Sequence, residues 1–167
     1  MKFEIQELSI DDGRFPENLR HIPAPPRILY CLGNPEALHH ALVIAIVGTR
    51  KATRYGLDTA RSLARDASIS GIAVASGLAL GIDAEAHAGA LEGTAPPIAV
   101  LGSGLRHIAP VTNRRLAERI LASGGAIVSE FEPDVEAAAW TFPQRNRIIA
   151  GLSHATIVVE APEKSGA

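Results

Sequence analysis

The feature that most constrains the fold of this chain is an alternation of short apolar runs with segments of helical periodicity. The apolar runs span residues 42–47, 72–75, 98–101, 126–129 and 155–160. The helical patterns between them span residues 55–67, 83–91, 112–122 and 144–152. Short apolar strands separated by amphipathic helices predict a parallel sheet that is covered on both faces. Right-handed crossovers then follow from the chirality of such connections.

The first 40 residues differ from the rest because they contain five prolines, which break long helices and central strands. We therefore expect residues 1–40 to form a short Pro-rich N-terminal extension that packs on a main domain at 41–167. Within the extension, Arg27 to Leu32 could form an edge strand. The expected fold class is α/β, with a Rossmann-like parallel sheet of about five or more strands and helices on both faces.

The composition is ordinary for a globular protein, with 47% hydrophobic and 20% charged residues. No apolar run approaches the ~18 residues that span a bilayer, and the N-terminus lacks the apolar core of a secretory signal. A single cysteine, Cys31, fits a reducing cytosol, so we expect a cytoplasmic protein without a membrane partner. The net charge of −2 excludes a global basic field. Charge is nevertheless segregated, because residues 43–56, 101–117 and 140–150 carry arginine or lysine and no acid.

Glycine, hydroxyl and arginine residues gather where the predicted strands end. The predicted ends read Gly48-Thr49-Arg50, Ser76-Gly77-Leu78-Ala79-Leu80-Gly81-Ile82-Asp83, Gly102-Ser103-Gly104 and Ser129-Glu130. The carboxyl ends of parallel strands meet at one edge of the sheet, where ligands bind. Free N–H groups at helix starts attract anions, and arginine contacts phosphate directly. These residues therefore predict one anion-binding crevice.

Two common nucleotide motifs are absent from this edge. The Gly77–Gly81 loop does not match the G-x-G-x-x-G dinucleotide fingerprint, and no Gly-Lys-Ser/Thr follows the glycines as in a P-loop. No cofactor is predicted. His39 and His40 lack further ligands at metal spacing, so no metal site is predicted either. His87 is interpreted as a packed helix residue, and Asp83 as a helix N-cap.

Ordered motifs along nearly the whole chain resemble the DNA-processing protein A family (DprA, also called Smf). The matching stretches are Phe15-Pro16-x-x-Leu19, Pro25-Pro26-x-x-Leu29-Tyr30, Val47-Gly48-Thr49-Arg50 with Thr53, Tyr55 and Gly56, Ser76-Gly77-Leu78-Ala79-x-Gly81-Ile82-Asp83 with Ala86-His87, Phe142-Pro143-x-Arg145-Asn146-Arg147-Ile148-Ile149, and Glu160-Ala161 with Lys164-Ser165-Gly166. Ala109-Pro110 departs from the family's Tyr-Pro. The family normally continues through a further strand and helix, so the resemblance implies a chain that is short at its C-terminus.

The resemblance implies sequence-independent binding of single-stranded DNA by a recombination mediator that is not an enzyme. It also implies a role in natural transformation, loading of a RecA-type recombinase and a possible homodimer. The candidate DNA- or phosphate-binding residues are Gly48, Thr49, Arg50, Lys51, Thr53, Ser76, Gly77, Gly81, Gly102, Gly104, Phe142, Arg145, Asn146, Lys164, Ser165 and Gly166.

Within this set Arg50 is the first choice for a phosphate contact. Of Arg145 and Arg147, we expect one to bind DNA and the other to anchor its loop. Trp140 and Phe142 lie two apart in a segment read as extended, so they are expected to share a face for base stacking. The alternative function is an enzyme or sensor that binds or hydrolyses a nucleotide in the same crevice, with Glu130 or Glu160 as the general base.

Overall fold

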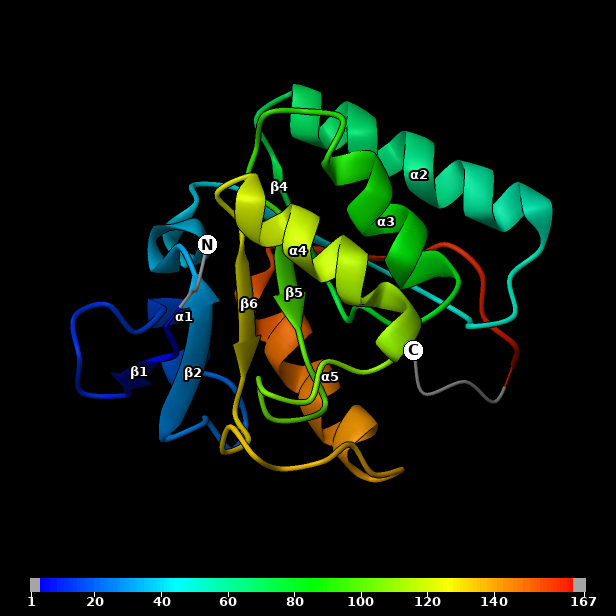
Figure 1. Cartoon of the computed structure of the whole chain (residues 1–167). Helices are drawn as coiled ribbons and strands as arrows, with labels where there is room; N and C mark the ends of the chain where they lie inside the picture. Colours follow the sequence, from blue (N-terminus) through cyan, green and yellow to red (C-terminus); the bar gives the residue numbers. More distant parts are fainter. Residues whose placement is uncertain (1–3, 164–167) are drawn as a thin grey trace.

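The computed structural model describes residues 4–163 and contains one sheet whose seven strands lie in the order β1-β2-β6-β5-β4-β3-β7 (Figure 1). The strands are β1 (Gln6–Ser9), β2 (Ile28–Gly33), β3 (Val43–Val47), β4 (Ala73–Ser76), β5 (Ile98–Val100), β6 (Ala126–Ser129) and β7 (Ala155–Val158). The pairs from β6 through β7 are all parallel, which confirms the predicted five-stranded parallel sheet. The two N-terminal strands add antiparallel pairs, so the whole sheet is mixed.

Helices cover both faces of the sheet, as predicted. The helices are α1 (Glu17–Arg20), α2 (Arg54–Ile69), α3 (Ile82–Ala90), α4 (Arg114–Ala122) and α5 (Thr141–Leu152), with short 3-10 helices η1 (Pro35–His39) and η2 (Val111–Asn113). One face carries α2, α3 and α4, whose buried residues pack on Ile46, Val74 and Ile127. The other face carries α1, η1 and α5. Alternate residues along each strand supply the two cores, as the two-residue period of a strand requires.

The expectation that Arg27 to Leu32 forms an edge strand is wrong. The strand β2 pairs with β1 on one side and with β6 on the other, so the edges of the sheet are β1 and β7. Its residues Leu29 to Leu32 are buried, and Leu29 and Cys31 join the same core as α5. Four of the five prolines of this region precede the strand and Pro35 follows it, so none interrupts its hydrogen-bonded ladder. Residues of the N-terminal segment therefore belong to the sheet itself.

Helix α5 begins at Thr141, three residues before the predicted start. The predicted helix over residues 144–152 leaves Pro143 outside. The structure places Pro143 in the first turn, where backbone N–H groups have no intrahelical acceptor and proline is tolerated. This shift brings Phe142 onto the helix and changes which residues share a face.

Candidate functional site

The crevice lies at the point where the order of the parallel strands reverses. Strand β3 pairs with β4 on one side and β7 on the other. The crossover through α2 leads from β3 to β4 over one face of the sheet, and the crossover through α5 leads from β6 to β7 over the other. In open α/β sheets a ligand crevice forms outside the carboxyl ends of the strands at such a point. The structure has a cavity of about 920 Å³ there. It is lined by Val47, Gly48, Thr49, Arg50, Lys51, Ala79, Asp83, Ala137, Ala138, Ala139, Phe142, Pro143, Arg145, Asn146, Ile149, Ala150 and Thr156.

One wall of the crevice is the loop between β3 and α2, which carries Arg50 and Lys51. The loop passes against Gly81, whose φ of +78° and lack of a Cβ allow a close approach, since a Cβ there would lie 2.4 Å from the Thr49 carbonyl oxygen. The Thr49 hydroxyl accepts a hydrogen bond of 3.2 Å from the backbone N–H of Lys51. Arg50 and Lys51 are exposed, and within residues 4–163 neither side chain has an ion pair. Both cations therefore remain available to an anion.

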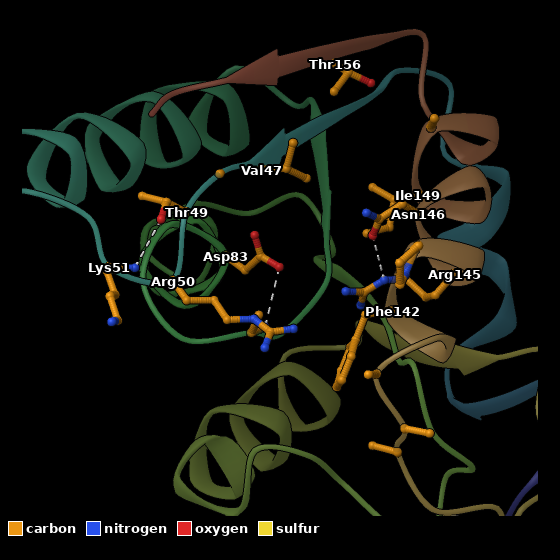
Figure 2. Close-up of a pocket in the computed structure, with 17 residues that line it drawn as sticks. Val47, Thr49, Arg50, Lys51, Asp83, Phe142, Arg145, Asn146, Ile149 and Thr156 are labelled. Carbon is orange, nitrogen blue, oxygen red and sulfur yellow. Dashed lines mark hydrogen bonds between the residues drawn. The ribbon is translucent and has the colours of Figure 1, made fainter. Parts of the chain in front are cut away.

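The opposite wall is formed by one side of α5. Phe142, Asn146 and Ile149 line the cavity and follow one another at helical spacing. Figure 2 shows Arg50 and Lys51 on one side of the cavity and Phe142, Arg145 and Asn146 on the other. The guanidinium carbon of Arg50 lies 4.6 Å from the centroid of the Phe142 ring, a cation–π geometry. The crevice thus joins unpaired positive charge to an apolar and aromatic surface.

Arg145 lies in the same wall but already has internal partners. Its side chain is buried, and Nη1 donates a hydrogen bond of 2.7 Å to the Gly77 carbonyl and another to the Val100 carbonyl. Burial lowers the pKa of Arg145, while the negative charge of Asp83 raises it. These contacts tie α5 to the ends of β4 and β5. Arg145 therefore supports the floor of the crevice more than it offers a free charge.

Asp83 holds the neighbouring loop, although it is not the helix N-cap that the sequence suggested. Gly81 occupies the N-cap position, and Asp83 is the second residue of α3. Its carboxylate accepts hydrogen bonds from the backbone N–H groups of Gly77 at 3.1 Å and Ala79 at 3.4 Å. Burial raises the pKa of Asp83, and the charge of Arg145 opposes that rise. Two N–H groups of this loop, those of Gly77 and Ala79, are thus already bound to a carboxylate of the chain itself.

Several predicted site residues act as supports behind the crevice and do not line it. The buried Ser76 hydroxyl donates a hydrogen bond of 2.6 Å to the Ile46 carbonyl. Gly102 gives room to the Phe142 ring, and Gly104 to the backbone at Glu132 and Pro133. Thr53, Gly77 and Gly81 also stand outside the cavity lining. Lys164, Ser165 and Gly166 lie outside the described residues.

Arg147 and Trp140 also lie in the basic segment of residues 140–150. Arg147 forms an ion pair of 2.5 Å with Glu130, so Arg145 and Arg147, one expected to bind DNA and the other to anchor its loop, both have internal partners. Trp140 is 61% exposed and packs edge-on against Phe131, with ring centroids 5.8 Å apart. The expectation that Trp140 and Phe142 share a face in an extended segment is wrong, because Trp140 has helical dihedrals and Phe142 is on α5. Residues two apart on a helix point in different directions.

The sequence-based prediction missed the apolar residues of the lining, including Ala137 to Ala139 and Ile149, and also the threonine Thr156. A predicted helix that begins at Thr141 would have put Ile149 on the same face as Phe142 and Asn146, because the three residues follow at helical spacing. Thr156 could not be found that way, because it depends on the pairing of β7 with β3. Among the described residues, no group of three or more histidine, cysteine, aspartate or glutamate side chains could hold a metal ion. No helix in this part of the chain is long and apolar enough to cross a membrane.

Comparison with known proteins agrees with this architecture. Residues 6–167 match the profile of the DNA recombination-mediator protein A family. The chain belongs to this family. It is 46% identical to the protein Smf of Synechocystis over 97% of its own length, and it spans 41% of that protein. The chain thus spans less than half of the length of this relative.

Two solved structures of family members share the fold. The DNA processing protein A of Streptococcus pneumoniae superposes with a TM-score of 0.90 at 35% identity, over 98% of this chain and 56% of that one. The corresponding protein of Helicobacter pylori, whose structure concerns its binding of single-stranded DNA, gives a TM-score of 0.87 at 33% identity over 98% of this chain and 73% of that one. Both likenesses support the mixed sheet and its Rossmann-like parallel part.

Proposed function

We propose that this chain binds single-stranded DNA without sequence preference in the crevice between the β3–α2 loop and α5. The observation that carries the proposal is Arg50, which has no ion pair among residues 4–163 and lies over the Phe142 ring, with Lys51 beside it in the lining of the same cavity (Figure 2). Phosphate groups bind arginine and lysine in any sequence, and every base has a π-face that can stack on an aromatic ring. The structure of the Helicobacter pylori relative concerns the mode in which that protein binds single-stranded DNA, which supports the same ligand class.

The contact between Arg50 and Phe142 indicates how a DNA strand would enter the crevice. In the free protein the guanidinium covers the ring. A base that stacks on Phe142 takes the place of the guanidinium, which then turns to a phosphate. The proposed ligand thus exchanges one cation–π contact for a stacking contact and a charge-assisted hydrogen bond.

Within the family, the proposed role is mediation of recombination, with a RecA-type recombinase and a second copy of the chain as partners. Catalysis is not part of the proposal. Glu130 and Glu160, the two acids that a nucleotide-hydrolysing enzyme could use as a base, both have partners. Glu130 is paired with Arg147, and Glu160 accepts hydrogen bonds from Thr53. These contacts favour a bracing role for each carboxylate.

The test is a titration of labelled oligonucleotides of mixed sequence, single- and double-stranded, followed by fluorescence anisotropy at two salt concentrations. We expect single strands to bind with a logarithmic salt slope of about −0.7 for each phosphate neutralised. Arg50→Ala should weaken binding about 5- to 10-fold, equally for all sequences, and make the slope less steep by about 0.7.

Arg65→Ala is the matched control, because Arg65 lies on α2 three turns from the crevice and pairs with Asp66. It removes the same charge without touching the cavity. Tight binding that neither salt nor Arg50→Ala alters would contradict the proposal, and so would equal losses in the two variants.

A further inference from the structure

The start of α2 has the features of a phosphate site in this class of fold. The loop after β3 leads directly into α2, a helix of sixteen residues with no acid in its first turn. Helix N-termini that follow the strand at a switch point bind nucleotide phosphates, because their free N–H groups and the helix dipole favour negative charge. Residues 43–56 contain Arg50, Lys51 and Arg54 and no acid of their own. An anion is therefore expected at this helix end.

The anion that the structure places there belongs to the chain itself. Glu160, which follows β7, extends its carboxylate to the start of the helix. Its Oε1 and Oε2 accept from the backbone N–H of Thr53 at 3.2 and 3.1 Å, and Oε2 accepts from the Thr53 hydroxyl at 2.8 Å. The same hydroxyl oxygen accepts from the Gly56 N–H at 3.1 Å. The carboxylate thus binds the N–H of the N-cap Thr53, and the Thr53 hydroxyl binds the N–H of Gly56, the third residue of α2.

The surrounding backbone leaves space for this carboxylate. A Cβ on Gly56 would lie 2.1 Å from Glu160 Oε2, so any other residue at that position would collide with it. A Cβ on Gly48 would lie 2.7 Å from the Glu160 carbonyl oxygen, which accepts a hydrogen bond of 2.7 Å from the Thr49 N–H. Two glycines thus admit Glu160 to both ends of the loop that carries Arg50 and Lys51.

A phosphate group at this helix end would have to share the site with a fixed negative charge. We propose that Glu160 is a specificity-determining residue, whose carboxylate occupies the phosphate position at the start of α2 and thereby keeps nucleotide phosphates out of it. Among residues 4–163, the cavity-lining cations without an ion pair or an internal hydrogen bond are then Arg50, which reaches toward Phe142, and Lys51 beside it on the same loop (Figure 2). The part of this inference that directs DNA phosphates to Arg50 rests on the proposed function. The part that excludes nucleotide phosphates from the start of α2 does not depend on DNA binding.

The experiment measures binding of inorganic pyrophosphate and of ADP by calorimetry to the wild-type chain, Glu160→Gln and Glu160→Ala. Glutamine keeps an oxygen that accepts from Thr53 while it removes the charge. We expect no saturable binding of pyrophosphate by the wild type at millimolar concentration. The affinity should rise about tenfold or more in Glu160→Gln, because a like charge within contact distance is removed.

Glu163→Gln is the control, since Glu163 is exposed in the same C-terminal segment and undergoes the same change of charge. A purely bracing role for Glu160 would lower stability in both Glu160 variants without any gain of pyrophosphate binding, and that result overturns the proposal. Equal pyrophosphate affinity in the wild type and Glu160→Gln overturns it as well. If Glu160→Ala does not fold, the pyrophosphate affinity of Glu160→Gln alone decides whether the proposal holds. The pyrophosphate result is independent of DNA binding, so failure of either proposal is seen separately.

Discussion

Two arginines of the crevice, Arg50 and Arg145, carry the same charge in opposite surroundings. Arg50 is exposed and lies over the Phe142 ring, whereas Arg145 is 4% exposed and donates to the carbonyls of Gly77 and Val100. A buried arginine without partners would be costly, so its internal hydrogen bonds are a condition of folding. The residue type predicted an anion contact for both, but only the surroundings separate a ligand-binding arginine from a structural one.

The burial of His87 predicts that the stability of the fold depends on pH. Its ring is fully buried, and burial lowers the pKa of His87 from 6.5 to about 4. Between pH 6.5 and pH 4 the unfolded chain therefore binds a proton on His87 that the folded chain does not bind. The free energy of unfolding consequently decreases as the pH falls through that range. Between pH 7 and pH 5 the expected loss in the free energy of unfolding is about 2 kcal/mol.

Urea denaturation at the two pH values measures this effect. His87→Leu should remove about 2 kcal/mol of the difference between pH 7 and pH 5, whatever its own stability at neutral pH. Replacement of the exposed His21 by leucine is the control and should leave most of the difference. An unchanged difference in His87→Leu would show that other groups cause the acid sensitivity.

At the scale of elements, α2 and α3 pack so closely that a glycine separates them. A Cβ on Gly89 of α3 would lie 2.1 Å from the Arg61 carbonyl oxygen of α2. In an isolated helix, Gly→Ala gains about 1 kcal/mol of helix stability. Here the backbone of α2 cannot move away cheaply, so we expect Gly89→Ala to destabilise the fold by about 1–3 kcal/mol.

Thermal denaturation of Gly89→Ala against Gly13→Ala tests this packing. A Cβ at Gly13 meets nothing within 4 Å, so that control should stay within about 0.5 kcal/mol of the wild type. Stabilisation by Gly89→Ala would mean that helix propensity outweighs the contact between the two helices.

At the scale of the whole molecule, the N-terminal segment is part of the central core. Leu29 of β2 is fully buried, together with Leu8, Phe15 and Leu19, against residues of β6 and α5. Leu29→Ala should therefore lower the free energy of unfolding by about 2–5 kcal/mol, the range for a truncated core leucine. The measurement is chemical denaturation, and Leu63→Ala is the control because Leu63 is 40% exposed. Similar small losses in both variants would contradict a shared core.

The sequence by itself determined the repeating units of this protein. Apolar runs such as Val43–Val47 and the helical patterns between them predicted the five parallel strands, because strand and helix periods depend on residues near in sequence. The same logic placed the loop with Gly48, Thr49 and Arg50 at the crevice, since parallel strands end at one edge of the sheet.

Only the tertiary structure decided which residues at that edge face a ligand. The insertion of β2 between β1 and β6 depends on pairing across about a hundred residues, which no local pattern records. The burial of Arg145, the position of Phe142 on α5 and the reach of Glu160 to α2 depend on elements that meet only in the folded chain. Charge and residue type are local properties, whereas the partners that use up a charge are set by packing.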